Sequence, residues 1–68
     1  MKLSARNQIP GLIVDVRPGA TTTLVRIDIG GAVVTASITN EAAADLALAA
    51  GKPALAIIKA SDVMVAIA

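Results

Sequence analysis

Two short polar segments interrupt otherwise apolar stretches of the chain, and both could bind an anion. The first offers a hydroxyl, a guanidinium, two amides and a run of backbone N–H groups, from Ser4, Ala5, Arg6, Asn7 and Gln8. Successive N–H groups can form a concave anion-binding nest, and a guanidinium can donate two parallel hydrogen bonds to an oxyanion. The alternative is a frayed, solvated segment that binds nothing.

The second polar segment is Lys59, Ala60 and Ser61, which directly follows a run of apolar residues. Its ammonium group, its backbone N–H groups and its serine hydroxyl are all donors to an anion. The alternative is a lysine whose stem covers apolar surface while its ammonium group lies in water. A third candidate is Thr39 with Asn40: the N–H groups of a helix N-terminus can bind an anion, but helix capping alone explains both residues.

The residue types do not favour catalysis. The chain has no His and no Cys, and a serine or threonine without a neighbouring base is a weak nucleophile. The five carboxylates are dispersed along the chain, so no pair is placed for general acid and base chemistry. We therefore predict a binding protein that is not an enzyme and that has no side chains ligating a metal cation.

Composition predicts self-association. The chain has 68 residues, of which 56% are hydrophobic, and it contains no aromatic residue and no Cys. A domain of this size rarely folds stably on its own core, and neither disulfides nor a Cys/His metal site can stabilise this one. The surplus apolar side chains must lie on surfaces that a partner covers, so we predict a homo-oligomer.

Charge and hydropathy argue against two other classes of partner. The net charge is +1 and the basic residues are scattered singly, whereas binding to a nucleic-acid backbone needs clustered Lys or Arg. Charged residues interrupt every apolar run before it reaches the roughly 20 residues of a membrane-spanning helix, and the first residues lack the apolar core of a signal peptide. We expect a cytoplasmic protein that binds neither nucleic acid nor membrane.

The elements that must position the polar segments follow from hydrophobic periodicity. Five strands are predicted, over residues 9–16, 21–29, 32–38, 54–58 and 63–67. A helix between the third and fourth begins at Thr39 or Asn40 and ends at Gly51, which suits a C-terminal cap. This order predicts an all-β fold with one short helix, a five-stranded OB-like barrel formed by a single domain over residues 1–68.

Alternation within the strands predicts which side chains share a face. In the first strand these are Leu12, Val14 and Val16. In the next two strands they are Thr23, Val25, Ile27 and Ile29, and then Val34, Ala36 and Ile38.

The segments together resemble the molbindin, or Mop, family over nearly the whole chain. The resemblance is carried by Ser-Ala-Arg-Asn-Gln at residues 4–8, Ile38-Thr39 before the helix, residues 46–51, and Ile58-Lys59-Ala60-Ser61. It implies a single Mop domain that assembles as a hexamer, a trimer of dimers. It also implies binding of molybdate, or tungstate, at subunit interfaces, for storage and homeostasis of molybdenum.

Carried over by position, the resemblance implies a definite oxyanion site. One subunit would contribute Ser4, Ala5, Arg6, Asn7, Lys59, Ala60 and Ser61, and a neighbouring subunit would contribute Thr39. Two positions depart from the pattern of other members. Ser61 stands where some members have Pro, and Ala42 stands where many have a polar residue, so Ala42 offers no side-chain donor.

Two other interpretations stay open at this point. An OB-like barrel could bind single-stranded nucleic acid, although such proteins stack bases on aromatic side chains and this chain has none. The chain could also be a purely structural oligomer whose polar segments bind nothing. Substitution of Arg6 and Lys59 separates this last interpretation from the molbindin prediction, because a structural oligomer would bind anions no differently afterwards.

Overall fold

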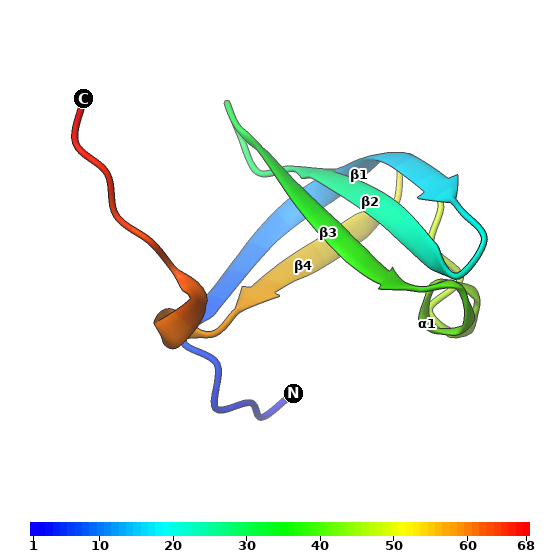
Figure 1. The fold of residues 1–68 in the computed structure, drawn as a ribbon, viewed down its shortest axis with the longest axis horizontal. Helices are drawn as coiled ribbons and strands as arrows, with labels where there is room; N and C mark the ends of the chain where they lie inside the picture. Colours follow the sequence, from blue (N-terminus) through cyan, green and yellow to red (C-terminus); the bar gives the residue numbers. More distant parts are fainter.

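The computed structural model describes residues 1–68 as one curled antiparallel sheet with a single short α-helix (Figure 1). The elements in chain order are β1 (Asn7–Pro18), β2 (Thr22–Asp28), β3 (Val33–Thr39), α1 (Asn40–Asp45), β4 (Pro53–Ile58) and the 3₁₀ turn η1 (Ala60–Asp62). The predicted class, all-β with one short helix, is confirmed. None of the helical segments combines the length and the hydropathy needed to cross a bilayer.

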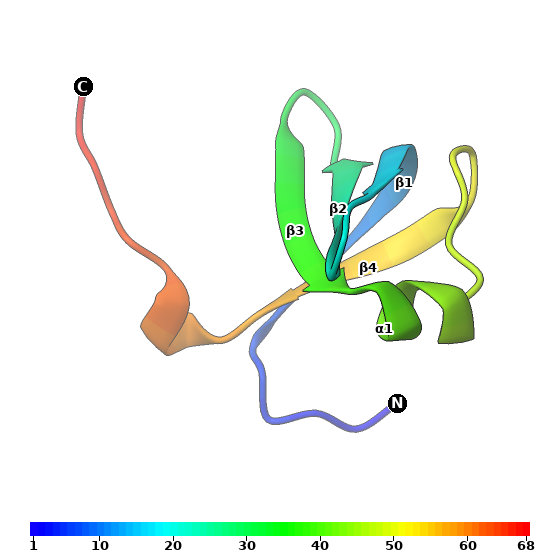
Figure 2. The same cartoon turned by 45° about the vertical axis from the view of Figure 1, so that its right-hand side comes forward.

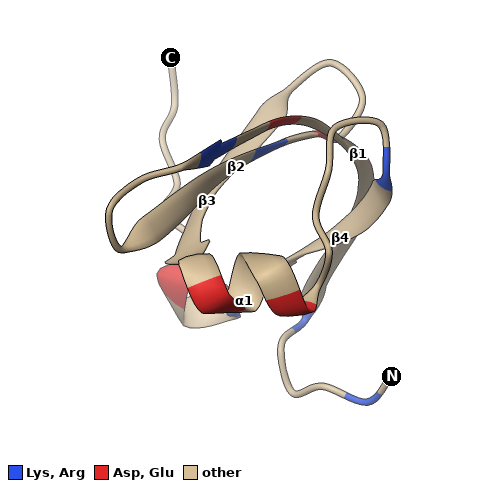
Figure 3. Ribbon diagram, turned by 90° about the vertical axis from the view of Figure 1, so that its right-hand side faces the viewer, with Lys and Arg blue, Asp and Glu red and all other residues tan.

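The sheet has the strand order β3-β2-β1-β4, and all neighbours are antiparallel. The 12-residue β1 pairs with β4 through its first half and with β2 through its second half. Where β1 passes from one partner to the other, a Cβ on Gly11 would lie 2.6 Å from the Asp28 carbonyl oxygen, so glycine is required. The sheet curls into a half-barrel with β3 and β4 as its edges (Figure 2), and α1 lies across one open end (Figure 3).

The inner faces of β2 and β3 are those that alternation predicts. Thr23, Val25 and Ile27 of β2 are buried, and the apolar residues predicted to face inward from β3 pack against them. For β1 the predicted face is wrong at its centre. Ile13 is the most buried residue at 1% exposure, whereas its neighbours Leu12 and Val14 are exposed.

A bulge explains the changed face of β1. The register against β2 shifts between Ile13 and Asp15, so that one residue of β1 has no partner. The residues before the shift point inward at odd positions, and Val16 returns to the inner face after it. A period of two residues therefore holds on each side of the bulge, but the inner face changes from odd positions before it to Val16 after it, so only Val16 of the predicted face points inward.

The start of α1 is tied to the sheet by side-chain hydrogen bonds. Thr39 caps the helix, as predicted, and its Oγ1 accepts a bond of 3.0 Å from the Ala42 N–H. The Asn40 Oδ1 accepts a bond of 2.6 Å from the buried Thr23 hydroxyl, and the Asn40 Nδ2 donates to the Gly19 carbonyl oxygen at 2.9 Å. These bonds account for Asn40 as a structural residue.

The end of α1 differs from the prediction. The helix ends at Asp45 and does not reach Gly51, because Ala47 adopts a left-handed conformation with φ of 50°. The N–H groups of Ala47 and Leu48 donate back to carbonyl oxygens of the last helical turn at 3.0 and 3.2 Å, which is a Schellman cap. Leu48 is thereby turned toward the core.

The predicted fifth strand, residues 63–67, does not form within the single chain. After β4 the turn η1 redirects the backbone, and residues 63–68 run away from the sheet (Figures 1 and 2). A strand needs a neighbour for its N–H and C=O groups, and no strand of the same chain lies beside this segment. The single chain therefore contains four strands.

The core enclosed by these four strands is small. Only five of the 68 residues are buried, namely Ile13, Thr23, Val25, Ile27 and Ala56. Large hydrophobic side chains remain exposed on every strand and on the segment after η1. Much of the apolar surface of the chain is thus left uncovered by its own fold.

Candidate functional site

The β1–β4 ladder brings the two predicted polar segments together. Asn7 and Ile58 form the terminal register pair of this ladder. Residues 4–6 and 59–61 continue directly from its paired ends and lie side by side at one end of the sheet (Figure 1). We call residues 4–7 and 59–61 the polar end.

Two amide side chains anchor the polar end to the fold. The Asn7 Nδ2 donates to the Ile58 carbonyl oxygen at 3.1 Å, and the Gln8 Nε2 donates to the Ala5 carbonyl oxygen at 3.1 Å. One N–H of the Asn7 amide is used in this way, and its second N–H is left for another acceptor. These bonds argue against a frayed segment in this part of the chain.

Several backbone N–H groups at the polar end have no acceptor within the chain. None of the N–H groups of residues 4–6 donates a hydrogen bond. In η1 the first bond runs from the Asp62 N–H to the Lys59 carbonyl oxygen at 2.9 Å. The N–H groups of Ala60 and Ser61 precede that bond, so the turn itself offers them no partner.

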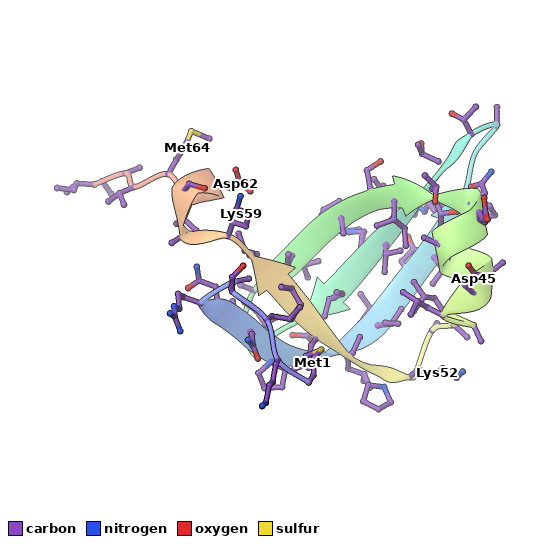
Figure 4. All side chains as sticks on the ribbon, turned by 90° about the horizontal axis from the view of Figure 1, so that it is seen from below. Met1, Asp45, Lys52, Lys59, Asp62 and Met64 are labelled. Atoms are coloured by element: carbon purple, nitrogen blue, oxygen red, sulfur yellow. The ribbon has the colours of Figure 1, made fainter.

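The polar end also carries two positive charges without ion-pair partners. Arg6 and Lys59 are both exposed, and the one ion pair of the chain joins Arg17 to Asp15 at 2.6 Å, elsewhere on β1. Asp62 projects from η1 close to Lys59 (Figure 4) but forms no ion pair with it. Two cations are therefore available to an anion, and one nearby carboxylate opposes its binding.

Thr39 lies far from the polar end. It pairs with Thr22 at the start of β2, so the whole of β1 separates it from Arg6. Figure 1 places α1 and the polar end at opposite ends of the molecule. Within one chain the Thr39 hydroxyl therefore cannot join Arg6 and Lys59 around a single small ion.

Nearly the whole chain matches a known domain family. The TOBE domain model matches residues 3–65. A probable molybdenum-pterin-binding protein of Haemophilus influenzae is 46% identical over 68 residues, which cover 98% of this chain and 99% of that protein. The chain is a molbindin of the TOBE domain family.

Solved structures of similar proteins confirm the molbindin architecture. MopII from Clostridium pasteurianum superposes with a TM-score of 0.90 at 33% identity, over 97% of this chain and 100% of that one. A molybdate-binding protein from Sporomusa ovata superposes with a TM-score of 0.94 at 30% identity, over 98% of this chain and 100% of that one. The predicted OB-like fold of molbindins is thus confirmed.

One feature of this molbindin is missed by the sequence prediction. An apolar groove of about 480 Å³ opens along the half-barrel, and 10 of its 11 lining residues are hydrophobic. The prediction closes the barrel with the chain's own fifth strand, which would fill that space. The excess of aliphatic residues predicts that some apolar surface is left uncovered by the chain, but it does not indicate where on the fold that surface lies.

Proposed function

We propose that this molbindin binds molybdate, or tungstate, at the polar end, where copies of the chain meet, and stores the ion in the cytoplasm without catalysis. The observation that carries the proposal is the placement of Arg6 and Lys59 together beyond the β1–β4 ladder, both without ion-pair partners. The names of two similar proteins support it, one probable molybdenum-pterin-binding and one molybdate-binding.

The donor chemistry of the polar end suits this class of ion. Molybdate is a tetrahedral dianion that is fully deprotonated at neutral pH, so it accepts hydrogen bonds and donates none. The available groups are backbone N–H groups, an ammonium, a guanidinium, an amide N–H and serine hydroxyls, which can all donate. Phosphate near neutral pH carries a proton that needs an acceptor, so such a site disfavours it. Sulfate is also deprotonated but smaller, and cavity size must reject it.

Thr39 of a neighbouring copy completes the site in this proposal. Its hydroxyl oxygen accepts a hydrogen bond from the Ala42 N–H, and its hydroxyl proton remains available to donate to an anion. Glu41 places a negative charge in the same helical turn. The positive charges of Arg6 and Lys59 from the other copy would offset that charge and the charge of the ion.

The homo-oligomer in this proposal is a hexamer, a trimer of dimers. The small buried core and the exposed aliphatic side chains support an assembly in which copies cover one another. Binding between copies also links the ion to the assembly, because a ligand that binds only the assembled form stabilises it.

Calorimetric titration tests the proposal directly. We expect heat with molybdate and tungstate and little heat with sulfate or phosphate. An intact oligomer that gives no heat with molybdate would overturn the proposal and leave the structural-oligomer interpretation.

Arg6→Gln and Lys59→Gln are the sharpest variants for the same titration. A charge-assisted hydrogen bond contributes about 1.5–3 kcal/mol, so each variant is expected to weaken molybdate binding by about 10- to 100-fold. Arg26→Gln is the matched control, because Arg26 is exposed on β2 and lies outside the polar end. Equal affinity for the Arg6→Gln and Arg26→Gln proteins would contradict the assignment of the site.

A further inference from the structure

Asp62 is the one side-chain carboxylate that the chain places beside its own polar end. It is the last residue of η1 and directly follows Ser61. The other four side-chain carboxylates lie further along β1, on β2 and on α1, and they are Asp15, Asp28, Glu41 and Asp45. Any repulsion that a copy of the chain exerts on an anion at its own polar end therefore comes mainly from Asp62.

The geometry of η1 brings the Asp62 carboxylate toward Lys59. The Asp62 N–H donates to the Lys59 carbonyl oxygen at 2.9 Å, which closes the turn. In a turn of this kind the side chains of residues i and i+3 lie on the same side, and Figure 4 shows Asp62 and Lys59 close together. The two side chains form no ion pair, so the ammonium group is free to bind an anion while a carboxylate remains near it.

The structure of η1 does not explain the carboxylate. Asp62 is exposed, and its side chain accepts no hydrogen bond and joins no ion pair. The start of α1 provides a contrast, because there the Thr39 hydroxyl accepts a bond of 3.0 Å from the Ala42 N–H and so caps the helix. The effect of Asp62 on this part of the chain is therefore one of charge.

The charges at this end of the sheet do not balance those of a dianion. Arg6 and Lys59 contribute two positive charges and Asp62 contributes one negative charge, which leaves a net charge of +1. Without the carboxylate, the two cations would neutralise a bound dianion completely. Asp62 thus opposes the binding of the ion that Arg6 and Lys59 attract.

We propose that Asp62 limits the affinity of the polar end for molybdate and reduces its preference for dianions over monoanions of the same shape. This inference rests on the proposed function, because it concerns the same ion site. Coulomb repulsion is proportional to the charge of the ion, so a fixed carboxylate opposes a dianion twice as strongly as a monoanion. A protein that stores an ion must also release it, and the carboxylate favours release without removing any donor.

Calorimetric titration with two ions tests the role of Asp62. Perrhenate is a tetrahedral oxyanion similar in size to molybdate, but it carries a single negative charge, so it isolates the effect of charge. The Asp62→Asn protein loses the negative charge and keeps the shape of the side chain. The Asp62→Glu protein keeps the charge.

The matched control is Asp28→Asn, which also removes one exposed negative charge. Asp28 pairs with Leu12, further along β1 than the polar end. Its carboxylate accepts a hydrogen bond of 2.9 Å from the Gly30 N–H, and the amide oxygen of an asparagine can accept the same bond. This control therefore changes the net charge of the chain without changing the charge beside Lys59.

We expect the Asp62→Asn protein to bind molybdate about 5- to 10-fold more tightly than the unmodified protein at low salt. Its gain for perrhenate, measured by displacement of molybdate, should be only about 2- to 3-fold, because the repulsion is half as strong. The gain for molybdate should shrink in about 1 M NaCl, which screens exposed charges. The Asp62→Glu and Asp28→Asn proteins should bind both ions as the unmodified protein does.

Three results would overturn the proposal. Unchanged or weaker binding of molybdate by the Asp62→Asn protein would mean that the carboxylate does not oppose the ion. An equal gain for molybdate and perrhenate would mean that the substitution changes the structure of η1, since a structural change affects both ions alike. An equal gain for the Asp28→Asn protein would assign the effect to the net charge of the chain.

The same titrations separate this inference from the proposed function. If the unmodified protein binds molybdate and the Asp62→Asn protein binds it no more tightly, the proposed function stands and the role of Asp62 is wrong. If neither protein binds molybdate, both the proposed function and the role of Asp62 are wrong.

Discussion

The two sides of the half-barrel are stabilised in different ways, as two isoleucines show. On the closed side, Ile13 of β1 is 1% exposed, and its backbone is hydrogen-bonded to Lys52 and Gly51 of the same chain. On the open side, Ile57 of β4 is 40% exposed and lines the groove. The closed side has its partners within one chain, whereas the open side leaves apolar surface uncovered. Stability of the fold and stability of the assembly should therefore respond to different residues.

The largest expected effect comes from truncation on the closed side. Ile13→Ala should lower the free energy of unfolding by about 2–5 kcal/mol, because it leaves a cavity in the core. Ile57→Ala should instead weaken association, so that its cost shrinks when the protein is diluted. Urea denaturation at several protein concentrations measures both. Equal losses for the two variants at the lowest concentration would contradict the division between the two sides.

A smaller effect is expected where β1 passes from β4 to β2. Gly11→Ala would put a Cβ 2.6 Å from the Asp28 carbonyl oxygen and equally close to Ile27. Such overpacking costs about 1–3 kcal/mol, since the strands must move apart. The loss should appear at every protein concentration, because the clash lies within one chain. If the Gly11→Ala protein has the same free energy of unfolding as the unmodified protein, β1 and β2 can move apart at this point without strain.

The smallest predicted effect is a gain in stability at the end of α1. Ala47 has a φ of 50°, a conformation that glycine adopts without steric cost. Ala47→Gly should therefore stabilise the chain by up to about 1 kcal/mol. Ala44→Gly is the control within the helix and should destabilise it by about the same amount. Thermal unfolding of both variants measures the difference, and a loss for Ala47→Gly would contradict the strain at that position.

Alternation predicts β2 and fails for β1 for a physical reason. β2 has one face buried along its whole length, so a period of two residues identifies its inner side chains directly. β1 serves two partners, and its bulge after Ile13 changes the phase where one partner replaces the other. Both Leu12 and Val14 are aliphatic, so nothing in their types distinguishes them from a core residue.

The residue at which α1 ends could not be predicted from the local sequence either. Gly51 is the usual type of residue for a left-handed cap, and it does have a φ of 91°, but in the turn before β4. The cap itself is Ala47, whose carbonyl oxygen accepts a bond of 2.8 Å from the Lys52 ammonium. Packing of Leu48 against the core accompanies the strained conformation. Tertiary contacts thus override the residue preference.

For the candidate site, the residue types pointed to the two polar segments, but they did not show that the β1–β4 ladder places these segments side by side. Arg6 and Lys59 are far apart along the chain, and only the register of β1 with β4 places them together. The resemblance to molbindins supplied that pairing in advance. The alternation of residues 63–67 predicts a strand, but it does not show whether a neighbouring strand is available within the chain, and none is.

Thr39 lies at the opposite end of the sheet from the polar end, and in the proposed site this separation has a consequence for the number of ions bound. Each copy carries the polar end at one end of the sheet and Thr39 at the other, and the proposed site combines the polar end of one copy with the Thr39 of another. In an assembly where every polar end meets the Thr39 of another copy, as proposed, the expected stoichiometry is one ion per chain. An open-ended row of copies would leave a polar end unmatched at one terminus and a Thr39 unmatched at the other, and would bind fewer ions than it has chains. The endpoint of a molybdate titration therefore reports on the closure of the assembly as well as on the ion.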